Sequence, residues 1–232
     1  MKKLIRGLLD FQRHTLPSYR ATFARLAKGQ SPDCLFISCS DSRVVPNLLV
    51  STDPGDLFTV RNVGNLVPPA VTGAQHSADR GEAAAIEFSL GFLPIEDVVV
   101  CGHSSCGAMK AILAGGNVDG APNLEQWLAH GAPSMKALRQ NNSLVGEGLP
   151  DADRLSQLNV LAQLEHLKTY PIVRDRLAAG TLRLHGWWFD IGAAQVHAYR
   201  EDLGRFVPID ETEGERLLTS LTEEPPALRA VQ

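Results

Sequence analysis

Apolar runs typical of buried β-strands alternate along the chain with longer segments in which apolar residues recur every three or four positions. The runs lie at residues 34–39, 57–61, 98–101 and 182–189. The helical segments lie at residues 78–90 and 151–179, and the second is interrupted at Tyr170-Pro171. Strands that alternate with helices predict an α/β fold, with a mostly parallel central β-sheet flanked by helices.

The two ends of the chain depart from this alternation. Residues 1–30 predict an N-terminal helical arm of two helices divided near Pro17, each with an apolar stripe. Because the arm precedes the core, we expect it to pack on a surface already built, either its own domain or a partner. Residues 31–210 form the predicted α/β domain, which ends with an added edge strand. Residues 211–232 are assigned to a C-terminal tail, in which residues 223–226 have the composition of a disordered segment.

Composition and charge narrow the range of partners. With 232 residues, 44% of them hydrophobic and 21% charged, the chain can bury a sizeable core. The net charge of −4 disfavours a nucleic-acid partner, which would attract a basic surface. Arg6 and Asp10 interrupt the apolar start, so neither an export signal nor a membrane partner is predicted. The four cysteines form no evident disulfide framework, which favours a cytoplasmic location; they are Cys34, Cys39, Cys101 and Cys106.

Candidate chemistry is concentrated where the third predicted strand ends. His103 lies at the carboxyl end of this strand, and Cys106 lies in the first turn of the following helix, for which Ser104 is the predicted N-cap. The helix dipole and the free N–H groups there favour a thiolate. A His and a Cys three residues apart can bind one metal ion, but two ligands do not form a site.

The first predicted strand offers a third ligand, because it also ends in a Cys followed by polar residues. If the two strands are parallel neighbours, Cys39 lies beside His103 and Cys106 at the carboxyl edge of the sheet. Two cysteines and one histidine are a known zinc set that leaves a fourth position for water or substrate. A structural zinc site usually has four ligands in two closely spaced pairs, and this chain has one such pair.

The two motifs, Cys-x-Asp-Ser-Arg at residues 39–43 and His-x-x-Cys-Gly at residues 103–107, resemble those of the β-class carbonic anhydrases. The resemblance runs from about Gln30 to Trp188 and includes a plant-like (type I-like) pocket. It implies that residues 31–210 are a catalytic domain that binds one Zn²⁺ per chain through the three ligands above. It also implies reversible hydration of carbon dioxide to bicarbonate and a proton by zinc-bound hydroxide. The implied assembly is a homodimer or a dimer of dimers, with each arm wrapped around a partner.

The resemblance assigns roles to residues near the ligands. By their own chemistry, Asp41 and Arg43 form an ordinary surface ion pair. The family instead implies that Arg43 holds Asp41 beside the zinc. Asp41 then either orients the hydroxide or becomes a metal ligand in a closed state, and the sequence leaves both open. Gln30 is implied to bind substrate, with Phe58 and Val63 lining an apolar pocket; without the resemblance, Gln30 is a solvated loop residue.

Three aromatic residues depart from patterns found in parts of the family. Phe88 stands where plant-like members have Tyr, so a hydroxyl is missing. Phe36 and Phe189 stand where some bacterial members have the Trp and Tyr of an inhibitory bicarbonate pocket. That form of regulation is therefore not expected here.

Two other functions fit the same motifs. A β-class scaffold can host a hydrolase of carbon disulfide or carbonyl sulfide, and a direct assay on each substrate distinguishes the two activities. A noncatalytic zinc-binding assembly protein is the alternative from another class. The presence of Asp41, Arg43 and Gln30 together argues against it, because a structural metal needs none of them.

Overall fold

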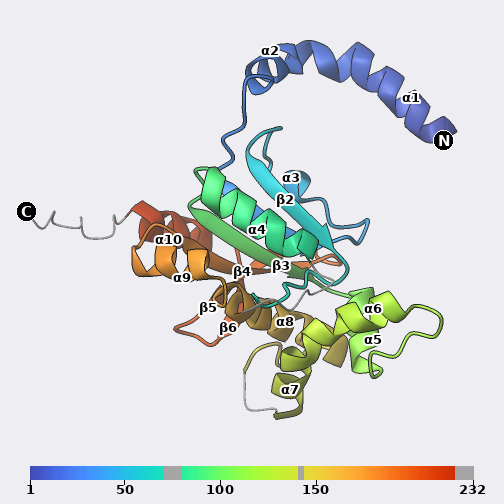
Figure 1. Ribbon diagram of the computed structural model, residues 1–232, viewed down its shortest axis with the longest axis vertical. Coiled ribbons are helices and arrows are strands. Elements are labelled where there is room, and N and C mark those ends of the chain that lie inside the picture. Colours follow the sequence, from blue (N-terminus) through green and yellow to red (C-terminus); the bar gives the residue numbers. More distant parts are fainter. Residues whose placement is uncertain (71–79, 141–143, 223–232) are drawn as a thin grey trace, which may run out of the picture.

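A six-stranded sheet forms the centre of the molecule (Figure 1). The computed structural model describes residues 1–70, 80–140 and 144–222. Strand order is β2-β1-β3-β4-β5-β6; β2, β1, β3 and β4 are parallel, whereas β5 and β6 extend the sheet antiparallel. The predicted α/β fold with a mostly parallel sheet is confirmed. The strands are β1 (Cys34–Cys39), β2 (Leu57–Asn62), β3 (Asp97–His103), β4 (Arg183–Asp190), β5 (Gln195–Arg200) and β6 (Arg205–Pro208).

Helices connect the parallel strands and cover the sheet unequally. One face packs its apolar side chains against α4, α8 and α9, in a core that includes Leu35 and Val100. The other face carries Phe36, Val99 and Cys101, with apolar residues around the short helix α3 and the half-buried Trp187. The helices are α1 (Lys2–Asp10), α2 (Leu16–Leu26), α3 (Pro46–Leu49), α4 (Arg80–Phe92), α5 (Gly107–Leu113), α6 (Pro122–Leu128), α7 (Ala132–Gln140), α8 (Asp151–Leu167), α9 (Pro171–Ala178) and α10 (Glu211–Thr222).

Most predicted boundaries lie within two residues of the observed ones. The interruption at Tyr170-Pro171 separates α8 from α9, as predicted. The helix predicted from residue 78 is described from Arg80 onward, and residues 71–79 lie outside the described part of the chain. The first half of the segment assigned to the tail is helix α10. Its Glu213 is buried and accepts a 2.9 Å hydrogen bond from Arg200 Nη1, so α10 is anchored to β5; residues 223–232 are not described.

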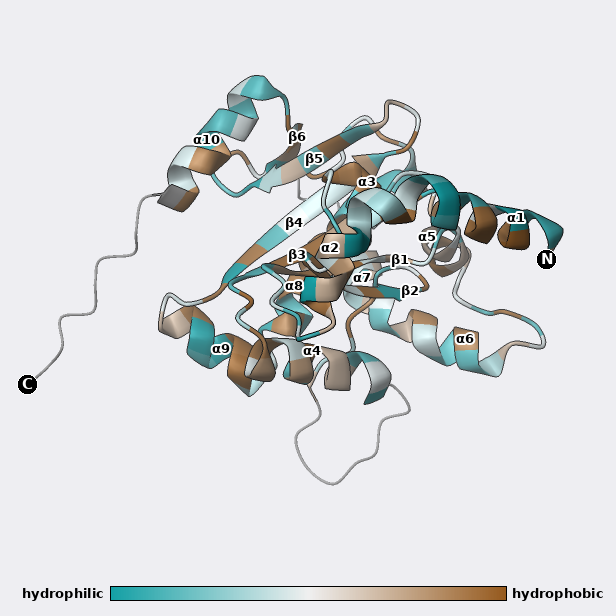
Figure 2. Ribbon diagram, turned by 90° about the horizontal axis from the view of Figure 1, so that it is seen from above, coloured by the Kyte–Doolittle hydropathy of each residue, from teal (hydrophilic) through white to brown (hydrophobic). Residues whose placement is uncertain are grey.

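The N-terminal arm is helical from Lys2 to Leu26, with a π-helical turn at Phe11–Thr15 between α1 and α2. It extends away from the sheet (Figure 1), and Figure 2 shows the apolar positions along α1. Leu4 and Leu8 are 69% and 57% exposed, and neither helix contains a buried residue. The apolar stripe of α1 is therefore not covered by the described part of its own domain. The attachment of the arm includes a 2.7 Å hydrogen bond from Tyr19 Oη to Asp53 Oδ1.

Helix α8 crosses β3 and β4 on the side of the main core. The contact with β3 is close at Gly102, where a Cβ atom would lie 2.8 Å from Val160 Cγ2 and 3.2 Å from the Ser156 carbonyl oxygen. A glycine therefore lets the helix approach the end of the strand that leads into His103. No described helix is long and apolar enough to cross a lipid bilayer.

Replacing this glycine tests the packing of α8. We expect Gly102→Ala to destabilise the protein by about 1–3 kcal/mol, because part of the strain falls on backbone atoms that cannot rotate away. Gly214→Ala in α10 is the control, since its Cβ would meet nothing within 4 Å. Thermal unfolding is the measurement, and 1 kcal/mol corresponds to about 2–4 °C in a chain of this size. Equal melting temperatures for Gly102→Ala and the wild type would show that the contact is not tight.

Candidate metal centre

Three side chains that can bind metal converge at the carboxyl edge of the sheet. β1 and β3 are parallel neighbours, with Ser38 opposite Cys101, so Cys39 and His103 leave the sheet side by side. The ligand atoms of Cys39, His103 and Cys106 all lie within 4.8 Å of one another, and all three residues are buried. The structure thus brings together the three residues that the strand pattern placed at one edge.

The His103 ring is held in the tautomer that a metal ligand requires. Its Nδ1 lies 2.9 Å from the Ser104 carbonyl oxygen, which can only accept, so Nδ1 carries the proton. Nε2 is then a bare acceptor, and it is buried without a hydrogen-bond partner. Burying such an atom without a partner is costly. A cation beside the two sulfur atoms is the partner that this atom lacks, so the residues fit a metal ion.

A hydrogen bond between Cys39 and Cys106 shifts the pKa values of the two thiols in opposite directions. A hydrogen bond from the Cys106 thiol lowers the pKa of Cys39, against the effect of burial, and the Gly64 N–H adds a 3.4 Å contact to the Cys39 sulfur. The same hydrogen bond raises the pKa of Cys106, and burial adds to this effect. A divalent cation bound to both sulfurs would instead favour both thiolates.

The remaining two cysteines do not belong to this cluster. All four are free thiols. Burial raises the pKa of Cys34, at the amino end of β1, to about 12, and it does the same for Cys101. These thiols therefore keep their protons and act as core residues.

The turn between the ligands differs from the predicted one. Helix α5 begins at Gly107 with Cys106 as its N-cap, so the assignment of Ser104 as N-cap is wrong. Ser104 instead continues the strand pairing, because its N–H donates to the Phe189 carbonyl at 2.9 Å. Its hydroxyl accepts a 2.9 Å hydrogen bond from the Ile191 N–H. Ser105 then reverses the chain direction with a φ of +55°.

Asp41 and Arg43 form a two-pronged ion pair beside the cluster. Arg43 Nε lies 2.9 Å from Asp41 Oδ1, and Nη2 lies 2.8 Å from Oδ2. These hydrogen bonds hold the pKa of Asp41 well below its usual range. Asp41 Oδ2 also lies 4.0 Å from His103 Nε2. The carboxylate is therefore ionised, oriented and next to the unpaired ring nitrogen.

Backbone contacts tie the ion pair to both ligand segments. Arg43 Nη2 also donates to the Ser105 carbonyl at 3.2 Å, which links the first motif to the second. Arg61 from β2 donates to the Asp41 carbonyl at 2.8 Å and to the Cys39 carbonyl at 3.2 Å. Sequence reasoning did not single out Arg61. The signal was its position at the carboxyl end of the strand next to β1.

The residues predicted to bind substrate lie on edge strand β2 and in the connecting segments. Gln30 is exposed between α2 and β1. Phe58 packs against Phe88, with ring centroids 6.0 Å apart. Val63 is 43% exposed, and its carbonyl accepts a 2.7 Å hydrogen bond from Trp127 Nε1.

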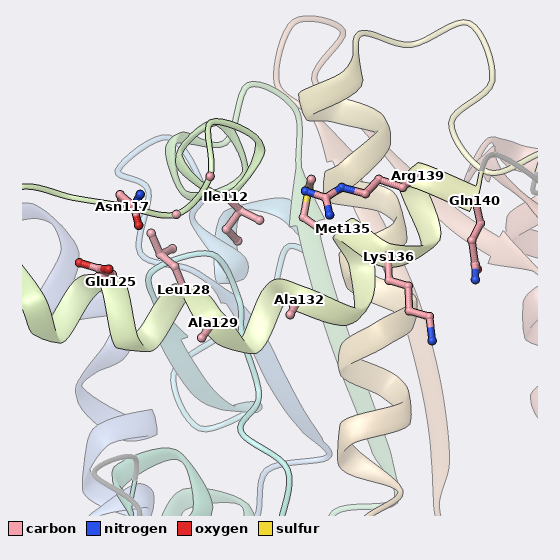
Figure 3. Close-up of a pocket in the computed structure, with 12 residues that line it drawn as sticks. Ile112, Asn117, Glu125, Leu128, Ala129, Ala132, Met135, Lys136, Arg139 and Gln140 are labelled. Carbon is pink, nitrogen blue, oxygen red and sulfur yellow. The ribbon is translucent and has the colours of Figure 1, made fainter.

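A separate hollow of about 560 Å³ lies among α5, α6 and α7 (Figure 3). Its lining combines apolar Ile112, Leu128 and Met135 with charged Lys136 and Arg139 from α7. It includes none of the three candidate ligands, so the metal-ligand cluster lies outside it.

Comparison with known proteins agrees with this geometry. Residues 34–196 match the family model described as carbonic anhydrase. The chain belongs to the β-carbonic anhydrase family. It is accordingly an enzyme of the carbonic anhydrase type, and the match contains both motifs and all three candidate ligands.

Individual relatives cover most of this β-carbonic anhydrase. A carbonic anhydrase from Synechococcus elongatus is 45% identical over 84% of this chain and 70% of its own length. One from Pseudomonas aeruginosa is 43% identical over 91% of this chain and 93% of its own. The solved β-carbonic anhydrase CcaA is 40% identical, with a TM-score of 0.81 over 90% of this chain and 98% of its own. A tetrameric β-carbonic anhydrase from Sordaria macrospora is 29% identical, with a TM-score of 0.71 over 85% of this chain and 95% of its own.

The two cysteines of β1 allow a matched test of the cluster. We expect the wild type to bind one zinc ion per chain and Cys39→Ser to lose it, because a neutral hydroxyl replaces a thiolate ligand. The loss of affinity should exceed the roughly 10–100-fold that removal of an outer-shell partner costs. Cys34→Ser is the control and should keep its metal. Elemental analysis of folded protein is the measurement, and full zinc in Cys39→Ser would contradict the assignment.

Proposed function

We propose that this β-carbonic anhydrase hydrates carbon dioxide reversibly to bicarbonate and a proton, using one Zn²⁺ per chain. The proposed ligands are Cys39 Sγ, His103 Nε2 and Cys106 Sγ. The observation that carries the proposal is the unpaired, buried Nε2 of His103 between two cysteine sulfurs and an ionised carboxylate. A purely structural metal has no use for that oriented carboxylate.

A bound zinc ion with three protein ligands supplies a Lewis acid that lowers the pKa of water in its open position. In a three-histidine carbonic anhydrase site this pKa is ~7. Here two thiolates and one neutral imidazole balance the metal charge, so water should ionise at a higher pH. The nearby guanidinium of Arg43 opposes that effect in part.

In this proposal, the Asp41 carboxylate orients the attacking water, and Arg43 holds the carboxylate in place. Since its pKa is lowered, Asp41 remains a carboxylate at every pH above its usual ~3.9. Oδ1 accepts hydrogen bonds from the Arg43 backbone N–H and from its Nε, whereas Oδ2 accepts one from Nη2. Oδ2 keeps further lone pairs, so it can accept a hydrogen bond from the attacking water. Asp41 as a fourth metal ligand requires it to leave Arg43, and we propose this closed form as the inactive alternative.

We further propose that the active unit is a homodimer or a dimer of dimers. Several apolar surfaces of the single chain support this. The α1 stripe is exposed, and Phe92, which stacks on Phe88, is 80% exposed. A hollow of about 540 Å³ lies on the sheet face that α3 leaves open, next to Val50 and Trp187. Exposed apolar residues gathered in this way are typical of interaction surfaces.

In such an assembly, Gln30, Phe58 and Val63 form the substrate pocket. Phe58 and Val63 supply apolar contacts suited to carbon dioxide, and the Gln30 amide supplies a hydrogen bond. We place the enzyme in the cytoplasm, which is supported by its four free thiols.

The proposed chemistry predicts a specific pH profile. Hydration activity should rise from neutral pH into the alkaline range, because Asp41 is ionised throughout and ionisation of the water is the remaining step. Asp41→Ala should keep zinc but lose roughly 10–100-fold in rate, the scale for an outer-shell partner. Arg43→Ala should lose activity chiefly near neutral pH, since Asp41 is then free to take the open metal position. Stopped-flow hydration assays at matched zinc content are the measurement.

A second ion pair of the same spacing provides the control. Asp202 accepts two hydrogen bonds from Arg200, with Nε 2.7 Å from Oδ1, in the β5–β6 hairpin. Asp202→Ala should leave the rate unchanged. Full activity in both Asp41→Ala and Arg43→Ala would reduce their pair to a surface contact. Turnover of carbonyl sulfide or carbon disulfide without hydration of carbon dioxide would contradict the proposed substrate.

Sharing of the site between subunits predicts complementation. Gln30→Ala and Cys39→Ser should each be inactive or strongly impaired. Mixing them under conditions of subunit exchange should restore about one-quarter of wild-type activity, since random pairing in a two-fold dimer gives half heterodimers with one intact site each.

A mixture of Cys39→Ser with His103→Ala is the matched control. Each variant lacks a metal ligand in its own chain, so neither subunit of their heterodimer contains an intact metal cluster. Subunit exchange is verified by mass. If Cys39→Ser then fails to rescue Gln30→Ala, Gln30 belongs to the site of its own chain or to no site.

A further inference from the structure

Two side chains in the first turns of α8 form hydrogen bonds with the backbone of residues 103–105, between the second and third candidate ligands. Asp153 Oδ1 accepts a hydrogen bond from the Ser105 N–H at 2.6 Å. Three residues later, the Ser156 hydroxyl donates to the His103 carbonyl at 2.8 Å. The close approach of α8 at Gly102 places both side chains within reach of the loop.

Ser105 is held in a conformation that a non-glycine residue adopts reluctantly. Its φ of +55° lies in the left-handed region, which costs of order 1 kcal/mol or more for a residue with a Cβ atom. Such a conformation persists only where neighbours fix it. Asp153 is the neighbour that holds the Ser105 N–H, and the opposite end of the residue, its carbonyl, accepts from Arg43 Nη2 at 3.2 Å.

Arg43 Nη2 therefore has two acceptors, Asp41 Oδ2 at 2.8 Å and the Ser105 carbonyl at 3.2 Å. The second acceptor fixes the direction from which the guanidinium meets Asp41. A chain of contacts thus runs from α8 through Ser105 and Arg43 to the carboxylate beside the metal ligands.

We propose that Asp153 is a positioning residue for the Asp41–Arg43 pair, acting through the backbone of Ser105. The inference rests on the proposed function, because it assigns Asp153 a part in orienting Asp41 for hydration. Asp153 contacts the backbone of Ser105 and not the donor atoms of Cys39, His103 or Cys106.

The competing explanation is that Asp153 only stabilises α8, since acidic residues in a first turn interact favourably with the helix dipole. Asp151 occupies the same turn and is exposed. Asp151→Ala removes the same charge without removing the acceptor for Ser105. Asp153→Glu keeps the charge but moves the carboxylate by one methylene, and Asp153→Asn keeps an acceptor oxygen in place.

Hydration rates at matched zinc content separate these explanations. Asp153→Ala and Asp153→Glu should lose roughly 10-fold in rate, at the lower end of outer-shell effects. Asp153→Asn should recover most of the rate, and Asp151→Ala should match the wild type. Should Asp153→Ala not fold, Asp153→Glu still decides the question, because a helix-dipole role is satisfied by either acid. Full activity in Asp153→Glu would overturn the proposal.

A double-mutant cycle tests the route through Arg43. In an Arg43→Ala background, Asp153→Ala should change the rate by less than ~2-fold, because the contact that it supports is already gone. An equal loss in both backgrounds would overturn the proposal, since Asp153 would then act independently of Arg43.

The visible spectrum of the cobalt-substituted protein provides a readout without turnover. Asp153→Ala and Arg43→Ala should both shift the ligand-field bands, because both release the carboxylate beside the metal, whereas Asp151→Ala should not. A wild type without hydration activity would defeat the proposed function, yet this spectral pattern would still support the positioning role. Unshifted bands in Asp153→Ala would overturn that role.

Discussion

The parallel pairing of β1 with β3 is the constraint on which the site depends. Both strands are buried, so their backbone groups must pair with each other, and the register that satisfies them aligns Ser38 with Cys101. That register brings Cys39 and His103 to the same edge of the sheet. A shift by one residue would turn Cys39 to the opposite face. Backbone hydrogen bonding therefore sets the geometry of a cluster whose own atoms are side chains.

Polar side chains along one side of helix α8, from the half-buried Asp153 to the buried Gln163, hold the loops at this edge of the sheet. Asp153 and Ser156 hold the loop after β3. Further along, Asn159 donates to the Gly64 carbonyl at 3.1 Å, and Gln163 accepts from the Val67 N–H at 2.8 Å. The helix thus fixes the loops after β2 and β3 together. Such groups are expensive to bury unless every one is paired, and their mutual pairing makes the arrangement specific.

One carboxylate and two guanidinium groups surround the three candidate metal ligands. The sulfur atoms of Cys39 and Cys106 lie beside the ionised Asp41, and the arginines at positions 43 and 61 hold the Asp41 segment from two sides. Arginine suits this role because its planar fork donates several hydrogen bonds in fixed directions. Only Ser42 lies between Asp41 and Arg43, and both are partly exposed, yet Arg43 also ties the pair to the second motif through the Ser105 carbonyl.

The sequence alone determined the alternation of strands and helices, the α/β class and the identity of the three candidate ligands. Those features depend on local periodicity and on the residues at strand ends, and both can be read directly from the sequence. It did not reveal the anchoring of α10 by Arg200 and Glu213, or the true cap of α5 at Cys106. Nor did it reveal the polar stripe of α8, because its apolar band dominated the pattern. These features arise from contacts between residues far apart in the chain, and only the tertiary structure decides which polar groups find partners.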